Sequence, residues 1–193
     1  MRELLLVAAL LFTFIQPAFT AEKPENAKKQ TKAGLYLTAK EAYAMKEKLG
    51  DKVLFIDVRT PAELVFVGSP VNMDKNIPLL TLDYTHWDER KGKYKKVFNP
   101  DFVSQFDALI HARKLTKDTP IILLCRSGSR SAKAANLLSS HNYSKLYTVV
   151  DGFEGDKATK GENKGKRVVN GWKNAGLPWS YKLDRKHSNL LTN

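Results

Sequence analysis

Three short apolar runs recur along the chain: "VLFID" (53–57), "IILLC" (121–125) and "LYTVVD" (146–151). They are rich in β-branched residues and do not alternate with polar ones, a pattern typical of strands buried on both faces of a parallel sheet. Segments with a helical pattern separate them. This order predicts an α/β fold, an open sheet of mainly parallel strands with helices on both faces.

Three segments have the pattern of helices. The first follows Thr38, which has capping-box spacing to Glu41, and we expect it to end at Gly50. The second lies within 99–115 and repeats apolar residues at helical spacing. The third lies within 129–142, directly after the second apolar run.

The two ends of the chain differ in composition from the middle. Residues 1–21 contain an apolar run of secretory-signal length that is too short to span a bilayer, so we expect a signal peptide and export, to a bacterial periplasm. An uncleaved N-terminal anchor is the alternative. We expect a flexible linker at 22–34, one domain at 35–182 and a loosely ordered tail at 183–193.

Two polar segments interrupt the pattern of the domain. Residues 71–99 mix aromatic residues with charge, and residues 154–170 are polar and basic. We expect both to be solvated loops. The alternative for either is a lip over a functional site or a docking surface.

The chain is basic, with 32 Lys and Arg against 20 Asp and Glu, a net charge of +12. Such a surface favours anionic substrates or an acidic protein partner. We expect no nucleic-acid partner, because no binding motif is present, and no membrane association after loss of the leader. The four histidines are scattered without ligand spacing and no glycine-rich nucleotide motif occurs, so we expect no metal and no cofactor.

Chemistry-bearing residues fall where the predicted strands end. Asp57, Cys125 and Asp151 each close one of the apolar runs. Ligands of open α/β sheets bind beyond the carboxyl ends of the strands. Cys125, the single cysteine of the chain, therefore lies where a site is expected, and it has no partner for an intramolecular disulfide.

The loop after this cysteine reads "CRSGSRS" and leads into a helix near Ser131. Gly128 allows the backbone to curl so that successive N–H groups point inward as an anion-binding nest. Arg126, Arg130 and the helix N-terminus favour the thiolate, which is the reactive form. The alternative is that Cys125 is a small hydrophobic residue ending a buried strand.

Two kinds of enzyme use such a loop, and spacing separates them. Cysteine phosphatases have C-x5-R, whereas Arg130 stands five positions after Cys125 and the sixth position is Ser131. The residue before the cysteine is Leu124, not the histidine of tyrosine phosphatases. The shorter loop resembles the active-site loop of the rhodanese (sulfurtransferase) family, which closes around a single persulfide sulfur.

Other motifs resemble that family over roughly residues 35–180. "IDVRTPAEL" is similar to its D-x-R-x-x-x-E signature, with Asp57, Arg59 and Glu63 at the matching positions. "NIP" (76–78), "VVDGFEG" (149–155) and "GWKNAGLPW" (171–179) resemble its later turn, closing strand and aromatic helix.

The resemblance implies sulfur transfer through a covalent intermediate. Cys125 is expected to attack the outer sulfur of a small anionic donor such as thiosulfate, release sulfite, and pass the persulfide sulfur to a thiol or cyanide acceptor. The expected persulfide-binding residues are those of the loop: Arg126, Ser127, Gly128, Ser129 and Arg130. We expect Arg126 to attract the donor and Arg130 to shape the loop by pairing with Asp57 or Glu63, while Asp57 and Arg59 support the loop.

Two other functions stay open at the level of the sequence. The first is a persulfide carrier or binding protein that delivers sulfur to an acidic partner without turnover of its own. The second is a cysteine phosphatase or arsenate reductase, which the length of the loop disfavours.

Overall fold

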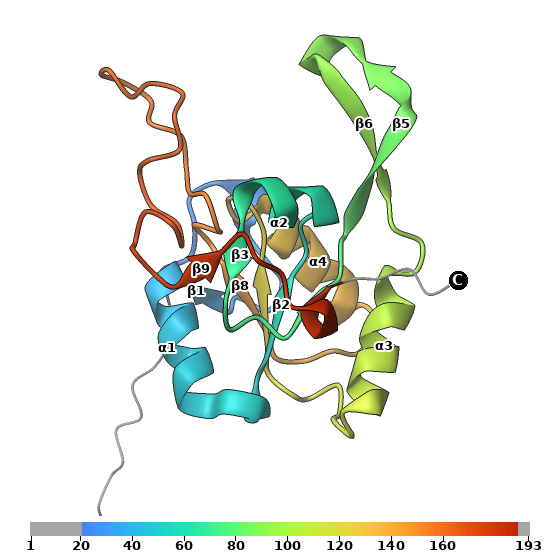
Figure 1. Cartoon of the computed structure of the whole chain (residues 1–193). Helices are drawn as coiled ribbons and strands as arrows, with labels where there is room; N and C mark the ends of the chain where they lie inside the picture. Colours follow the sequence, from blue (N-terminus) through green and yellow to red (C-terminus); the bar gives the residue numbers. More distant parts are fainter. Residues whose placement is uncertain (1–20, 189–193) are drawn as a thin grey trace, which may run out of the picture.

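Five short parallel strands form the central sheet of the protein, whose computed structural model describes residues 21–188 (Figure 1). In spatial order they are β1 (Tyr36–Leu37), β8 (Leu146–Val149), β7 (Ile121–Leu124), β2 (Leu54–Asp57) and β4 (Lys75–Asn76), and every neighbouring pair is parallel. The three apolar runs are thus the three inner strands, which confirms the predicted α/β sheet.

Helices cover both faces of this sheet, as predicted. They are α1 (Ala39–Leu49), α2 (Pro61–Val67), α3 (Phe102–Ala112) and α4 (Ser129–Ser139). Neighbouring residues of β2 point to opposite faces. Ile56 packs in the apolar core that contains the buried residues of α3 and α4, and Phe55 packs in the core that contains those of α1 and α2.

Capping boxes start two of the helices. Thr38 Oγ1 accepts a hydrogen bond from the backbone N–H of Glu41 at 3.2 Å, and the Glu41 carboxylate accepts one from the Thr38 N–H at 2.7 Å. This confirms the cap and the start predicted for α1. Thr60 and Glu63 form the same box at the start of α2, where Pro61 occupies the first turn. The second box brings Glu63 to the carboxyl edge of the sheet.

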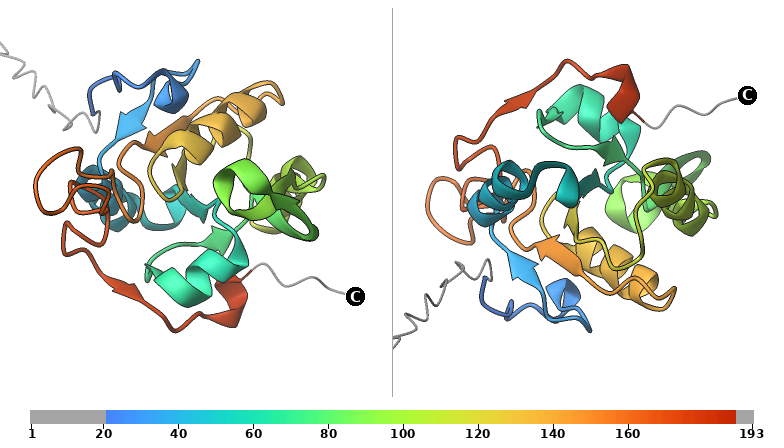
Figure 2. Two further views of the ribbon diagram at one scale, coloured as in Figure 1. Left: turned by 90° about the horizontal axis from the view of Figure 1, so that it is seen from above. Right: turned by 90° about the horizontal axis from the view of Figure 1, so that it is seen from below.

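The segments that leave the sheet at its carboxyl edge surround one region of the molecule. Because the strands are parallel, β2 leads into α2, β7 into the cysteine loop, β8 into residues 150–155 and β4 toward a long hairpin. Viewed from above, α2, α4, the hairpin and the inserted segment 154–170 surround the end of the sheet (Figure 2). Residues far apart in sequence therefore converge there.

Residues 71–99 are not the solvated loop that we expected. They contain β4 and a two-stranded antiparallel hairpin, β5 (Leu80–Asp88) and β6 (Lys93–Phe98), which pairs with no other strand of the described residues. A β-bulge between Asp83 and Trp87 and a left-handed Gly92 shape the hairpin. Pairing of strands separated by a short turn satisfies the backbone of this polar segment, which composition alone did not indicate.

The second insertion, 154–170, is mostly irregular, in keeping with the expected loop. Its regular contacts are the isolated bridges Lys157–Arg167 and Ala158–Lys164. It projects from the same end of the molecule as the hairpin, with α2 between them (Figure 1). The two insertions therefore flank the carboxyl edge of the sheet.

Residues 22–34 depart from the flexible linker that we expected. The short helical turn η1 (Ala27–Lys29) packs against α4, and Lys29 is only 8% exposed. Lys29 Nζ forms an ion pair with Asp156 at 2.7 Å. The segment is ordered because these long-range contacts, which its polar composition does not reveal, tie it to the domain.

Smaller elements complete the described chain. A two-stranded antiparallel sheet pairs β3 (Ser69–Pro70) with β9 (Trp179–Ser180). The remaining helical turns are η2 (Gly50–Lys52), η3 (Glu89–Lys91) and η4 (Arg185–His187). The start of the predicted tail lies against the domain, since Lys75 Nζ donates to the Lys186 carbonyl at 3.2 Å.

The predicted signal peptide lies, up to residue 20, outside the described residues, as does the end of the tail at 189–193. Between residues 21 and 188, no helix has both the length and the apolar composition needed to cross a membrane. Within the same range, no cluster of three or more His, Cys, Asp or Glu side chains is arranged to hold a metal ion.

Candidate functional site

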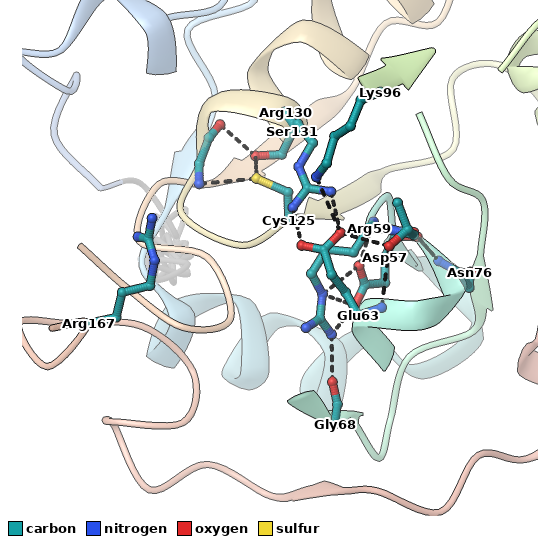
Figure 3. Close-up of polar contacts among 12 residues, drawn as sticks. Asp57, Arg59, Glu63, Gly68, Asn76, Lys96, Cys125, Arg130, Ser131 and Arg167 are labelled. Atoms are coloured by element: carbon teal, nitrogen blue, oxygen red, sulfur yellow. Dashed lines mark hydrogen bonds and ion pairs between the residues drawn. The ribbon is translucent and has the colours of Figure 1, made fainter. Parts of the chain in front are cut away.

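Cys125 follows the last residue of β7 and lies between the apolar core and the loop. The residue is 1% exposed, and its side chain belongs to the core between the sheet and helices α3 and α4. Its carbonyl accepts the Phe153 N–H at 2.8 Å, which fixes the strand end against the turn after β8. The cysteine is therefore buried, as expected if it were only a small hydrophobic residue ending a strand. Its sulfur, however, also faces polar groups of the loop (Figure 3).

The loop folds back so that a backbone amide points at the sulfur. The Gly128 N–H donates to Cys125 Sγ at 3.1 Å. Gly128 has φ +93°, and a Cβ atom there would lie 2.3 Å from the Val150 carbonyl oxygen. Only glycine fits this combination of left-handed backbone and close approach. Because α4 begins at Ser129, the sulfur also lies near the positive end of that helix.

Ser131 adds a hydroxyl group to the surroundings of the sulfur. Its Oγ lies 3.6 Å from Cys125 Sγ and donates to the Gly128 carbonyl at 2.8 Å. The hydroxyl accepts from the thiol when sulfur is protonated, and rotation of its O–H toward sulfur would supply a donor to the thiolate. The sequence places Ser131 near the helix start and at the sixth position after the cysteine, and no motif assigns it a role.

Arg130 closes the loop through Glu63, one of the two acids that we expected. Arg130 Nη1 donates to Glu63 Oε2 at 2.7 Å, and Nη2 donates to Oε1, so the pair is bidentate. Burial raises the pKa of Glu63, but the hydrogen bond and charge of Arg130, with smaller contributions from Lys96 and Thr60, outweigh it and hold that pKa at about 2. Arg130 therefore shapes the loop.

Asp57 and Arg59 form a second, fully buried ion pair. Arg59 Nη2 donates to Asp57 Oδ2 at 2.7 Å and to the Gly68 carbonyl at 2.9 Å, and Arg59 Cζ lies 4.1 Å from the centre of the Phe153 ring. Both side chains are 0% exposed. The pair joins the end of β2 to the end of α2 and to the turn after β8.

Three cations from three segments lie around the cysteine. Arg126 is exposed on the loop, Lys96 comes from β6, and Arg167 comes from the insertion; Lys96 and Arg167 lie on opposite sides of Cys125 (Figure 3). Burial lowers the pKa of Lys96, and the charges of Arg130 and Arg126 lower it further. Burial and then the charge of Arg126 lower the pKa of Arg167. We call Arg126, Lys96 and Arg167 the cationic rim.

A pocket of about 190 Å³ opens beside the loop. It is lined by Val67, Glu154, Arg167, Lys173 and Asn174. The N–H groups of Glu154 and Gly155 both donate to the Arg126 carbonyl, so this wall of the pocket is attached to the cysteine loop. Arg167 could not be singled out within the basic insertion from the sequence, because no motif marks it.

The remaining predicted residues lie in or near the loop. Ser127 and Ser129 are half-buried, and a Cβ on Gly152 would lie 2.5 Å from the Ser127 nitrogen. Asp151 is buried after β8, accepts the Gly171 N–H at 3.3 Å, and has a pKa raised by burial. Asp151 thus joins two parts of the chain on either side of the insertion.

Together these groups suit one kind of chemistry. A sulfur atom at a strand end faces an amide donor, a hydroxyl group and a helix N-terminus, with cations around the opening. Such groups stabilise negative charge on sulfur without moving when the charge forms. The arrangement therefore fits a cysteine nucleophile that acts on a small anion.

Comparisons with known proteins agree with this geometry. The family model described as "Rhodanese-like domain" matches residues 38–159. An uncharacterized protein of Rickettsia rickettsii is 34% identical over 131 residues, which are 68% of this chain and 85% of that protein. The thiosulfate sulfurtransferase GlpE of Tolumonas auensis is 42% identical over 43 residues, 22% of this chain and 41% of that protein.

A solved structure shares the fold. The crystal structure of Rv0390 from M. tuberculosis superposes with a TM-score of 0.54 and 28% sequence identity. The match covers 76% of this chain and 97% of that chain. The family match spans residues 38–159, so Lys29 lies before it and Arg167 lies after it.

Proposed function

Since the chain belongs to the rhodanese-like domain family, with sulfurtransferase activity supported at the family level, we propose that it moves a sulfane sulfur from a thiosulfate-like donor to a thiol or cyanide acceptor through a persulfide on Cys125. The observation that carries this proposal is the Gly128 N–H at 3.1 Å from Cys125 Sγ, in a loop closed by the Arg130–Glu63 ion pair.

In the first step, the Cys125 thiolate attacks the outer sulfur of thiosulfate. A new S–S bond forms on Cys125, the original S–S bond of thiosulfate breaks, and its electron pair leaves with sulfite. The total charge is unchanged, and no external oxidant or reductant is needed. The Gly128 amide and the N-terminus of α4 stabilise the negative charge on sulfur before and after the transfer.

In the second step, a nucleophilic acceptor attacks the outer sulfur of the persulfide. The bond between this sulfur and Cys125 Sγ breaks, and its electron pair returns to Cys125 as a thiolate. Cyanide becomes thiocyanate, and a thiolate becomes a persulfide. The cysteine returns to its starting state, as nucleophilic catalysis requires.

The cationic rim attracts the anionic donor electrostatically. Arg126 is exposed, its charge acts on both Lys96 and Arg167, and Arg167 lines the adjoining pocket. A dianionic donor entering beside these side chains has its negative charge offset on two sides. Cys125 is buried, so the donor must insert its outer sulfur into the loop while its sulfonate group stays at the rim.

A sulfur-transfer assay with thiosulfate and cyanide tests the proposal. Wild type should form thiocyanate over many turnovers, and Cys125→Ser should form none. Mass spectrometry after thiosulfate treatment should show one added sulfur atom in wild type and none in Cys125→Ser. If wild type forms the adduct but does not turn over with any sulfane donor, it is a carrier and not an enzyme. Hydrolysis of an aryl phosphate that depends on Cys125 would contradict the proposal.

We also propose export, on the apolar run of residues 1–21. Expression of the full chain in a Gram-negative bacterium, with fractionation and N-terminal sequencing, tests this. A shortened protein in the periplasm is expected, and a full-length protein in the cytoplasm would contradict it.

A further inference from the structure

We propose that the β5–β6 hairpin and the outward face of α2 form a docking surface for an acidic protein whose cysteine thiolate takes the sulfur from Cys125. The inference rests on the proposed function and names its acceptor. We define the docking surface by its exposed apolar and cationic side chains: Val65, Phe66, Tyr84, Trp87, Tyr94, Lys93 and Lys95.

The β5–β6 hairpin is a separate two-stranded sheet and does not extend the central sheet. Within residues 21–188 its strands pair only with each other, and in Figure 1 it stands away from the central sheet. An isolated two-stranded hairpin is at best marginally stable in water. Asn99, which donates to the Pro78 carbonyl at 2.8 Å, fixes the base of the hairpin and leaves its far end projecting.

Three aromatic rings gather on this projecting hairpin. Tyr94 makes edge-to-face contacts with Tyr84 and Trp87, with ring centres 5.3 Å apart in each case. The residues are nevertheless 67% (Tyr84), 47% (Trp87) and 44% (Tyr94) exposed. Tyr and Trp are the residues most enriched at energetically important positions of protein interfaces. An exposed aromatic cluster is thus better explained by a partner than by the fold.

The exposed surface continues onto α2. Phe66 is 80% exposed and Val65 is 49% exposed on this short helix. A pocket of about 210 Å³ lies between the start of α2 and the hairpin, lined by Thr60, Pro61, Ala62, Thr81, Leu82 and Tyr84. Hairpin and helix therefore form one hollowed surface, into which a partner side chain can insert.

Charge identifies the class of partner. Within 80–98 there are five cations and three carboxylates, and two of these carboxylates are engaged locally: Asp83 by Thr85 and His86, and Asp88 by Lys91. Among residues 21–188, no ion pair is found for Lys93 or Lys95. An acidic surface complements this arrangement.

The docking surface connects to the loop that holds the sulfur. Lys96 of β6 lies 3.9 Å from Glu63 Oε2, and Glu63 holds Arg130. Trp87 pairs with Tyr94 beyond the bulge, and Tyr94 lies two residues along β6 from Lys96, a distance of about 7 Å in a strand. A protein with a protruding cysteine can therefore contact both places.

The transfer step is balanced for such an acceptor. The partner thiolate attacks the outer sulfur of the Cys125 persulfide, a new S–S bond forms on the partner, and the bond to Cys125 Sγ breaks. Cys125 leaves as a thiolate, and the partner carries the persulfide. No electrons are gained or lost overall.

Synthetic acceptor peptides provide the test. An acidic peptide with one central cysteine and a neutral peptide of the same length serve as probes, with thiosulfate as donor. At low salt, wild type should use the acidic peptide with kcat/KM about tenfold above that of the neutral one. The double variant Lys93→Glu/Lys95→Glu should lose this preference while its thiosulfate–cyanide turnover stays within about twofold of wild type.

Two further variants separate docking from bulk charge. Lys52→Glu/Lys145→Glu changes the net charge equally with exposed lysines that precede β2 and β8, at the opposite edge of the sheet, and should keep the preference. Phe66→Ser removes an exposed ring without a folding cost and should raise KM for the acidic peptide about threefold.

The outcomes distinguish the two proposals. Loss of the preference in both charge variants, or its persistence in both, would overturn the docking surface while leaving sulfur transfer intact. Failure of wild type to turn over thiosulfate and cyanide would remove the proposed function, and this inference with it.

Discussion

Glu63 is the residue on which the shape of the cysteine loop depends. It caps α2 with one interaction and holds Arg130 with another, so one carboxylate joins the start of a helix to the loop. Its lowered pKa means that the folded state stabilises the ionised carboxylate of Glu63 relative to the unfolded chain. The contribution of Glu63 to stability is therefore complete above its ordinary pKa of 4.5 and is lost as pH falls toward about 2.

For Glu63→Gln we expect a free energy of unfolding about 2 kcal/mol below wild type at neutral pH, because a largely buried charged hydrogen-bonded pair is broken. The difference should shrink below pH 4.5, as wild type itself becomes protonated at this position. Urea unfolding followed by circular dichroism at neutral and acidic pH measures both values. A difference that does not change with pH would mean that the ionised carboxylate does not stabilise the fold.

Arg167 is expected to attract the anionic donor through its charge. For Arg167→Met we expect KM for thiosulfate to rise about fivefold with kcat nearly unchanged, since its charge attracts the donor but lies away from the bond that breaks. Lys166→Met, at the neighbouring exposed position, is the matched control and should change KM little. Steady-state kinetics measures the two parameters, and equal effects of the two variants would contradict a specific role for Arg167.

At the scale of elements, the segment before the first strand braces the inserted segment. Lys29 Nζ bonds both oxygens of Asp156 at 2.8 and 2.7 Å, and Asp156 and Asn170 bond each other across the base of the insertion. A Cβ on Gly128 would lie 3.1 Å from Lys29 Cδ, so the same side chain also lies against the cysteine loop. Residues 21–37 thus connect the loop and the segment that carries Arg167.

We expect Lys29→Met to loosen the insertion. Trypsin should then cleave between Lys157 and Arg167 several-fold faster than in wild type, because proteolysis follows local opening. KM for thiosulfate should rise as well, since Arg167 is held less firmly. Lys28→Met, its exposed neighbour, should leave both unchanged. Mass mapping of the fragments identifies the cleavage sites, and identical fragment patterns for the two variants would argue against this brace.

On the scale of the whole molecule, positive charge dominates the surface. The net charge is +12, and the cationic rim lies at the one edge of the sheet where the segments converge. A field of this sign attracts a dianionic donor from solution and is weakened by salt.

We therefore expect kcat/KM for thiosulfate to fall about tenfold between low salt and about 0.5 M salt, because the Debye length shrinks below the size of the rim. The free energy of unfolding, measured in the same buffers, checks that the protein stays folded. A value of kcat/KM that is independent of salt would show that the net charge does not assist donor capture.

The structure also shows which parts of the protein could be read from the sequence. The inner strands, the cap of α1 and the position of Cys125 at a strand end were predicted correctly, because each depends on residues within a few positions of one another. From the sequence, the acid that pairs with Arg130 was predicted to be either Asp57 or Glu63. The structure shows that it is Glu63, because Asp57 is already paired with Arg59.

The sequence by itself determined a parallel α/β sheet with a cysteine loop at its carboxyl edge, through local apolar patterns, a helix cap and one glycine-containing motif. Tertiary structure alone decided the surroundings of that loop: the hairpin, the Lys29 brace and the place of Arg167. Arg130 meets Glu63 across 67 residues and Lys29 meets Asp156 across 127, and such contacts leave no periodic trace in a sequence. They form because the chain folds so that all parallel strands end at one edge, which brings distant charges into one place.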